Sequence, residues 1–135
     1  MPLFVALDVG SKTIGVAVAS VDARLPTPQF IVARQSVARD VAELIERLDD
    51  VAEWVVGLPY LPSGDEGRSA KLARQIGVAL GEATGLPVHY QDETLSSVEA
   101  EERLREAGHR SRAIKGLIDS WAAAVILEDW LNERL

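Results

Sequence analysis

Residues 3–19, LFVALDVGSKTIGVAVA, form the segment from which the architecture of the whole chain follows. Leu3–Leu7 and Ile14–Ala19 are apolar runs on either side of a polar segment that contains Gly10. Runs of this length around a glycine turn are typical of a β-hairpin. Neither run alternates apolar with polar residues, so we expect both strands to be buried on both faces, as central strands of a sheet are.

Asp8 places a charge at the exit of the first apolar run. An unpaired carboxylate is costly to bury, so a cation or a set of hydrogen-bond donors must meet it. Two arrangements stay open on this stretch alone. Either the backbone N–H groups of the Gly10–Thr13 turn donate to Asp8, or Asp8 belongs to a metal or phosphate site.

Length and composition indicate the general class of protein. The chain has 135 residues, 47% of them hydrophobic, and no cysteine. This size corresponds to a single domain, residues 1–135, and the lack of cysteine excludes disulfides and agrees with a reducing compartment. The chain enters a strand without a basic leader, and no apolar run reaches about 18 residues, so we expect a cytoplasmic protein that is neither secreted nor membrane-spanning.

The formal net charge of −7 argues against a nucleic-acid partner, because affinity for phosphates comes mostly from lysine and arginine. Many acidic residues, however, fall in 40–53, 99–106 and 128–133, on the expected solvent faces of helices. One basic run opposes them: Arg103, Arg105, His109, Arg110, Arg112 and Lys115. Such a run is more often a solvated face than a binding site, so it favours nucleic-acid binding only weakly.

The rest of the chain alternates strand-like and helix-like patterns after a turn at Pro26–Pro28. Expected strands lie at Phe30–Ala33, Trp54–Leu58 and Leu86–Tyr90, and expected helices at 38–50, 72–83, 96–107 and 112–135. Gly85 is placed to end the second helix of the chain in a left-handed conformation, and Ser96 and Glu99 have the spacing of a capping box.

This order of elements predicts a mixed sheet with the first strand at or near its centre. The last two strands are each reached through a helix, so they should pair in parallel by right-handed crossovers beside the first strand. Ligand sites in such sheets lie beyond the carboxyl ends of the parallel strands. That edge is therefore where we expect functional side chains.

Acidic residues that are distant in sequence can meet at this edge. Asp8 lies at the carboxyl end of the first strand, and Asp92 and Glu93 lie just past that of the fifth. Asp119 precedes a pair of alanines by three and four residues, so it shares their helix face. Because alanines let a helix approach a sheet closely, this face should lie against the sheet and bring Asp119 to the same point.

Converging carboxylates either share a proton or hold a hard cation. Oxygen ligands without cysteine or histidine select Mg²⁺ or Mn²⁺ over zinc, and two such ions about 3.5–4 Å apart hydrolyse phosphodiesters without a protein nucleophile. Simpler roles stay open: Asp119 could cap a helix N-terminus, and Asp92 or Glu93 could be polar loop residues. His89 is more simply a strand residue than a ligand.

Four blocks of the sequence, in order, resemble the YqgF/RuvX family: Asp8–Lys12 with Ile14–Ala17, Val55–Pro59, Asp92–Glu93 with Ser96 and Ser97, and Ile118–Asp119 with Ala122, Ala123, Ile126 and Leu127. These are small bacterial proteins related to Holliday-junction resolvases and described as nucleases that mature the precursor of 16S ribosomal RNA. The resemblance covers nearly the whole chain. It implies an α/β, RNase H-like fold with a mixed five-stranded sheet in the order 3-2-1-4-5 flanked by helices, and it assigns Asp8, Glu93 and Asp119 as metal-binding catalytic acids.

The chain departs from the family pattern at Thr13 and Thr94, where family members usually have arginine. Both differences remove a cation from the neighbourhood of a substrate phosphate. Lys12 and Lys115 are our candidates for contacts to backbone phosphates, which position a strand without distinguishing its bases. An ordinary surface position is the alternative for each lysine.

Asp92 and Glu93 would point to opposite faces of a continuing strand, so only one of them can enter the site. The resemblance favours Glu93 and leaves Asp92 as a supporting residue. We therefore expect a nuclease that binds Mg²⁺ or Mn²⁺, with two ions, and that hydrolyses RNA or single-stranded DNA. The family implies a role in processing the 5′ end of pre-16S rRNA or in nucleic-acid repair.

Three other functions stay open. Holliday junction resolution normally needs a two-fold dimer, whereas we expect a monomer or weak homodimer. A phosphate-binding domain of the actin and sugar-kinase type needs two such domains around a nucleotide. A non-catalytic nucleic-acid-binding factor would have lost its site, against which the three retained acids argue. The expected partners are RNA and single-stranded or branched DNA, without a membrane.

Overall fold

The computed structural model describes residues 1–93, 106 and 111–134, without the side chains of 111–117. A five-stranded sheet in the order β3-β2-β1-β4-β5 forms its centre. The strands are β1 (Leu3–Val9), β2 (Thr13–Ser20), β3 (Thr27–Ala33), β4 (Val51–Leu58) and β5 (Val88–Asp92). The β1–β2 and β2–β3 pairs are antiparallel, and the β1–β4 and β4–β5 pairs are parallel. The predicted strand order and directions are confirmed.

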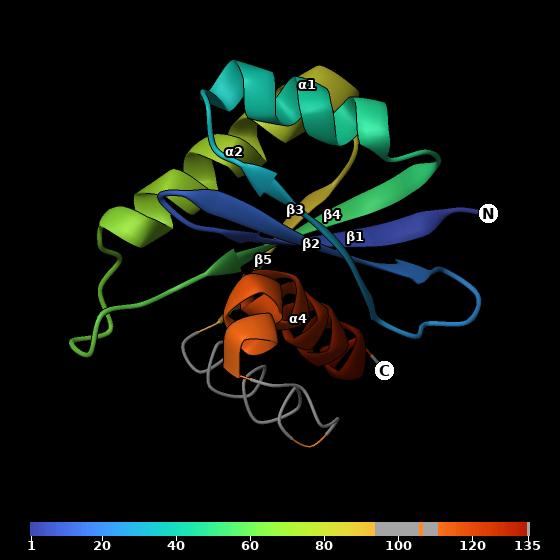
Figure 1. Ribbon diagram of the computed structural model, residues 1–135. Coiled ribbons are helices and arrows are strands. Elements are labelled where there is room, and N and C mark those ends of the chain that lie inside the picture. The colour runs from blue at the N-terminus through green and yellow to red at the C-terminus, as the bar shows by residue number, and fades with distance from the viewer. Residues whose placement is uncertain (94–105, 107–110, 135) are drawn as a thin grey trace.

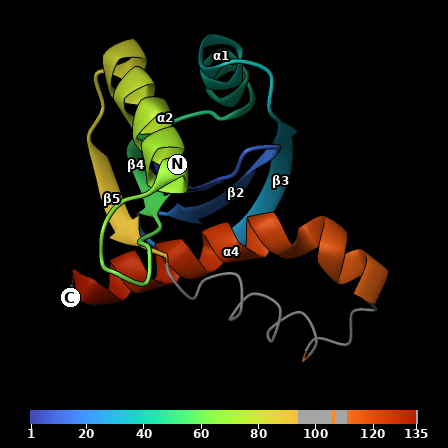
Figure 2. The ribbon, with the colours of Figure 1, turned by 90° about the vertical axis from the view of Figure 1, so that its left-hand side faces the viewer.

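Helices cover both faces of the sheet (Figure 1). The described helices are α1 (Val37–Arg47), α2 (Arg68–Thr84) and α4 (Ser111–Glu133). Figure 2 shows α1 and α2 together on one face, with α4 running across the other. Of these described helices, none has both the length and the hydropathy needed to cross a membrane.

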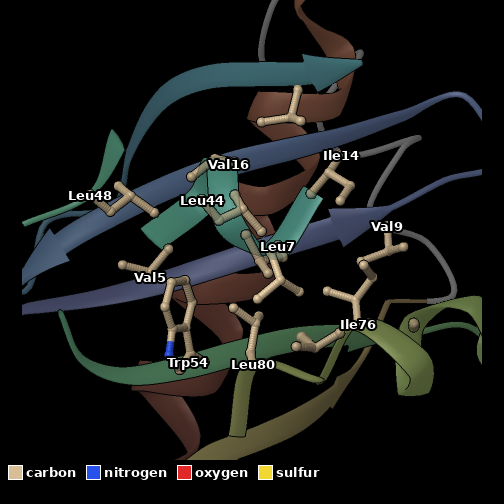
Figure 3. Packing of buried hydrophobic residues seen from close by; sticks show 14 of the residues in the cluster. Val5, Leu7, Val9, Ile14, Val16, Leu44, Leu48, Trp54, Ile76 and Leu80 are labelled. Atoms are coloured by element: carbon tan, nitrogen blue, oxygen red, sulfur yellow. The ribbon is translucent and has the colours of Figure 1, made fainter. Parts of the chain in front are cut away.

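Strand β1 is buried on both faces, as its unbroken apolar sequence predicts. Val5 and Leu7 face α1 and α2, where they join the larger core together with Trp54 of β4 (Figure 3). Phe4 and Ala6 point the opposite way and pack in the cluster that α4 completes. This alternation, which is the period of two of any strand, fixes which side chains of each strand meet α4.

Element boundaries differ from the sequence prediction at a few positions. β3 starts at Thr27 instead of Phe30, because Pro28 lies on an edge strand beside a register shift, where a missing N–H is tolerated. β5 lies two residues later than predicted, and α1 ends at Arg47 instead of near residue 50. Gly85 caps α2 with φ 68°, as predicted. The predicted helix 96–107 and its capping box lie, apart from residue 106, outside the described residues.

Candidate active site

Asp8 lies on the face of the sheet that α4 covers. It follows Phe4 and Ala6 in the alternation of β1, and both of these residues pack in the cluster completed by α4. Its partner in the β1–β2 register is Gly15. The Asp8 carboxylate therefore starts from the carboxyl end of the central strand and points toward the helix, as predicted.

Glu93 reaches the same place from the edge of the sheet. Its backbone N–H donates to the carbonyl of Leu58 (3.4 Å), which keeps residue 93 beside the end of β4. A Cβ added to Gly57 would lie only 2.9 Å from Glu93 Cδ, so the absent side chain of Gly57 provides the space for the carboxyl group. The sequence analysis missed this role of Gly57, although a glycine inside an apolar strand is itself a signal of close approach.

The two adjacent acids point to opposite faces, which settles which of them lies near α4. Tyr90 packs against α2, whereas Gln91 donates to Glu133 of α4 (3.1 Å). By alternation Glu93 follows Gln91 toward α4, and Asp92 is exposed on the other side. Asp92 is therefore a neighbour of the acidic group and not one of its converging members.

Asp119 is brought down onto the sheet by Gly15. A Cβ on Gly15 would lie 2.0 Å from the carbonyl oxygen of Asp119, so the backbones of β2 and α4 touch directly at this point. Since α4 begins at Ser111, the alternative that Asp119 caps a helix N-terminus is wrong. Its side chain accepts a hydrogen bond from the hydroxyl of Thr13, the first residue of β2.

The electrostatics show that the three acids lie within range of one another. Burial first, then a hydrogen bond with Asp8 and the charges of Asp8, Asp92 and Asp119, together raise the pKa of Glu93 to about 10. Burial also raises the pKa of Asp8, with the hydrogen bond from Glu93 opposing and the charge of Asp119 adding to this effect. Glu93 therefore keeps its proton and donates a hydrogen bond to the Asp8 carboxylate.

The hydrogen bond between Glu93 and Asp8 identifies a partner of the buried Asp8 carboxylate. The N–H of Gly10 donates to the carbonyl of Thr13 (2.8 Å) and closes the hairpin turn. The partner that meets Asp8 is Glu93, a carboxyl group from a strand at the far edge of the sheet. His89 is a residue of β5 that pairs with Glu53 (2.7 Å), in agreement with a place in the strand and not among ligands.

The comparison with known protein families agrees with this geometry. Residues 3–133 match the model of the RuvX family, described as Holliday junction resolvase. The chain belongs to the RuvX family. A relative from Anaeromyxobacter sp. (strain Fw109-5), named "Putative pre-16S rRNA nuclease", is 42% identical over 97% of each chain. A protein of the same name from Picosynechococcus sp. (strain ATCC 27264 / PCC 7002 / PR-6) is 39% identical over 95% of this chain and 90% of its own.

Solved structures with the same fold include two resolvases. The fowlpox virus resolvase, in a complex with Holliday junction DNA, superposes with a TM-score of 0.65 at 12% identity, over 98% of this chain and 99% of its own. Thermus thermophilus RuvC, in complex with a Holliday junction substrate, gives a TM-score of 0.55 at 19% identity, over 99% and 96%. The predicted family and RNase H-like fold are thus confirmed.

The donor chemistry of this RuvX-family site fits a hard divalent cation. Asp8, Glu93 and Asp119 offer only carboxylate oxygens, the ligands that such cations prefer. Among the described residues, no three acidic or histidine side chains already surround one cation position. Asp8 and Glu93 instead share a proton, and a proton and a metal ion compete for the same oxygens.

The predicted phosphate-binding lysines stay predictions in this member of the RuvX family. Lys12 is exposed in the turn between β1 and β2, on the chain segment that connects Asp8 to Thr13. Lys115 belongs to α4, but its side chain, like residue 94, lies outside the described part.

Proposed function

We propose that this RuvX-family chain, residues 1–135 acting as one domain, is a divalent-metal-dependent nuclease of the cytoplasm. Asp8, Glu93 and Asp119 are its metal-binding catalytic acids. The observation that carries this proposal is the burial of Glu93 and Asp8 in direct contact, close enough to Asp119 for its charge to raise both pKa values. Two carboxyl groups in such contact share a proton, and a divalent cation that binds between them takes the place of that proton.

The acids would hold Mg²⁺ or Mn²⁺, two ions in all, which when bound activate water for attack on the phosphodiester and stabilise the leaving oxygen. For a metal ion to bind, Glu93 must lose the proton through which it hydrogen-bonds to Asp8. Gly57 keeps space open beside the Glu93 carboxyl, and Thr13 holds Asp119 from the strand side. Asp92, on the opposite face, adds negative charge nearby without entering the site.

The substrate is RNA or single-stranded DNA. The names of the relatives support pre-16S rRNA 5′-end processing as the physiological role. Lys12, which is exposed beside the strand end that carries Asp8, is our first candidate for a contact to a backbone phosphate, and Lys115 is the second. The protein acts as a monomer or weak homodimer.

Holliday junction resolution is the second candidate function, because the family description names it and two solved structures of this fold hold junction DNA. It requires two active sites related by a two-fold axis, since two strands must be cut symmetrically. A non-catalytic nucleic-acid-binding role is the third, and it predicts binding without cleavage.

Cleavage of labelled single-stranded RNA, single-stranded DNA and a four-way junction tests the proposal. The reactions contain Mn²⁺, Mg²⁺ or chelator, and compare wild type with Asp8→Asn and with Asp92→Asn as the matched control. We expect cleavage that needs the metal, is lost in Asp8→Asn and persists in Asp92→Asn, with binding retained in all three proteins. Equal cleavage by wild type and Asp8→Asn would refute the metal role, and cleavage of the junction alone would favour resolution.

A further inference from the structure

Thr13 connects the N-terminal hairpin to the acidic residue supplied by α4. Its hydroxyl donates to Oδ2 of Asp119, a partner 106 positions away in the chain. Both side chains are half-buried, which shields the hydrogen bond from competing water. Because the donor is uncharged, it can fix one carboxylate oxygen without neutralising the negative charge that a cation requires.

Hydrogen bonds hold the turn that carries Thr13 in place. The carbonyl of Thr13 accepts from the N–H of Gly10 (2.8 Å), and the carbonyl of Lys12 accepts from the N–H of Arg34 (2.9 Å). The guanidinium of Arg34 also donates to the carbonyl of Gly10 (2.8 Å) and to Asp40 (2.7 Å). Asp40 is only 1% exposed, so this ion pair is anchored inside the protein. Thr13 therefore projects from a fixed position.

The acceptor is equally constrained along its backbone. Gly15 lies two residues after Thr13, on the same face of β2, and has no side chain to separate the strand from Asp119. With the backbone of Asp119 held against the sheet, the rotation of its carboxylate is the freedom that remains. The Thr13 hydroxyl removes that freedom.

We propose that Thr13 is a positioning residue, which orients the Asp119 carboxylate toward the Asp8–Glu93 pair so that the three acids bind metal together. This inference rests on the proposed function, since the orientation matters only if a cation binds. Loss of a group that orients a metal ligand typically weakens metal affinity by about 10–100-fold. Thr13→Val removes the hydroxyl but keeps the branched shape, and Thr13→Ser keeps the hydroxyl.

The test is titration of Mn²⁺ alone into the full chain by calorimetry, with no nucleic acid present. We expect Thr13→Val to bind Mn²⁺ about 10-fold more weakly than wild type and Thr13→Ser to bind nearly as well. Thr27→Val is the matched control, because the exposed Thr27 hydroxyl donates to the nearby carbonyl of Leu25 (3.2 Å), at the other end of the sheet. It should leave the affinity unchanged.

The possible results separate this inference from the proposed function. If wild type does not bind Mn²⁺, the proposed function itself fails. If wild type binds and Thr13→Val binds equally well, only the role of Thr13 is overturned, and the same holds if Thr13→Ser is as weak as Thr13→Val. Thermal melting of each variant in chelator identifies any that is unfolded, and Thr13→Ala provides a second variant without the hydroxyl.

Discussion

Replacing Glu93 by glutamine is expected to make the metal-free protein more stable. In the folded protein the pKa of Glu93 is about 10 because of burial and the neighbouring acids, against an ordinary value of 4.5. At pH 7 folding must therefore place a proton on a group that would otherwise be ionised, which costs about 3 kcal/mol. Glutamine avoids this cost, because its amide is neutral and its N–H can still donate to Asp8.

The pH dependence of the stability follows from the two pKa values of Glu93, the ordinary 4.5 of the unfolded chain and about 10 in the folded protein. Between pH 4.5 and about 10 the folded chain holds the Glu93 proton and the unfolded chain does not. The contribution of Glu93 to the stability of wild type is therefore greatest below pH 4.5 and falls as the pH rises, by about 1.4 kcal/mol per pH unit up to about pH 10. The advantage of Glu93→Gln should grow from about 1 kcal/mol at pH 5.5 to about 3 kcal/mol at pH 7.

Urea unfolding in EDTA, followed by tryptophan fluorescence at pH 5.5, 7 and 8.5, measures this difference. Asp92→Asn is the control, because it removes an adjacent acid that lies on the opposite, exposed side of the strand. An advantage of Glu93→Gln that does not change with pH, or a variant less stable than wild type at pH 8.5, would refute the reasoning. Either result would mean that Glu93 is not a buried, protonated partner of Asp8.

Three further perturbations have expected outcomes. Raising the pH should lower the Mn²⁺ concentration needed for half-maximal cleavage, because metal must displace the Glu93 proton; a constant requirement between pH 6 and 8.5 would contradict this. Gly15→Ala should destabilise the fold by about 1–3 kcal/mol in urea unfolding, since its Cβ would overlap the α4 backbone. Gly81→Ala, in the interior of α2, should instead stabilise the fold by about 0.5–1 kcal/mol, because the nearest atom to its Cβ would be Val88 Cγ2 of β5 at an ordinary contact distance of 3.5 Å. Asp40→Ala should destabilise the fold by about 3–5 kcal/mol, because it leaves the largely buried guanidinium of Arg34 without its carboxylate. Glu43→Ala breaks the exposed ion pair with Arg47 and should cost less than about 1 kcal/mol. Equal effects of the two variants would show that burial is not the cause.

The architecture and the acidic group could be predicted because both depend on local patterns. Unbroken apolar runs mark the central strands, and helices inserted before β4 and β5 impose their parallel pairing. Parallel strands end at the same edge, which brings Asp8 and Glu93 together without knowledge of their contacts. The alternation of side chains also showed that Asp92 and Glu93 could not both face α4.

Contacts that depend on the packing of α4 could not be predicted. The hydrogen bond from Thr13 to Asp119 joins residues 106 positions apart, and nothing in either local sequence requires it. Gly15 and Gly57, as glycines inside apolar strands, signal a close approach, but the sequence does not say that the helix backbone and the Glu93 carboxyl are what approaches them. The sequence also left the partner of Asp8 open between the backbone N–H groups of the turn and a metal or phosphate site, and the contact with the Glu93 carboxyl depends on the three-dimensional arrangement.

The touching backbones at Gly15 and Asp119 have a consequence for redesign of this fold. A contact between main chains involves no side-chain rotamer, so at this point the separation of helix and sheet does not depend on the size of a side chain. The outward-facing positions of that helix can therefore be replaced by other polar or charged residues while the Asp119 carboxylate keeps its place. At Gly15 itself any side chain would collide with the helix backbone, so a designer should keep glycine there.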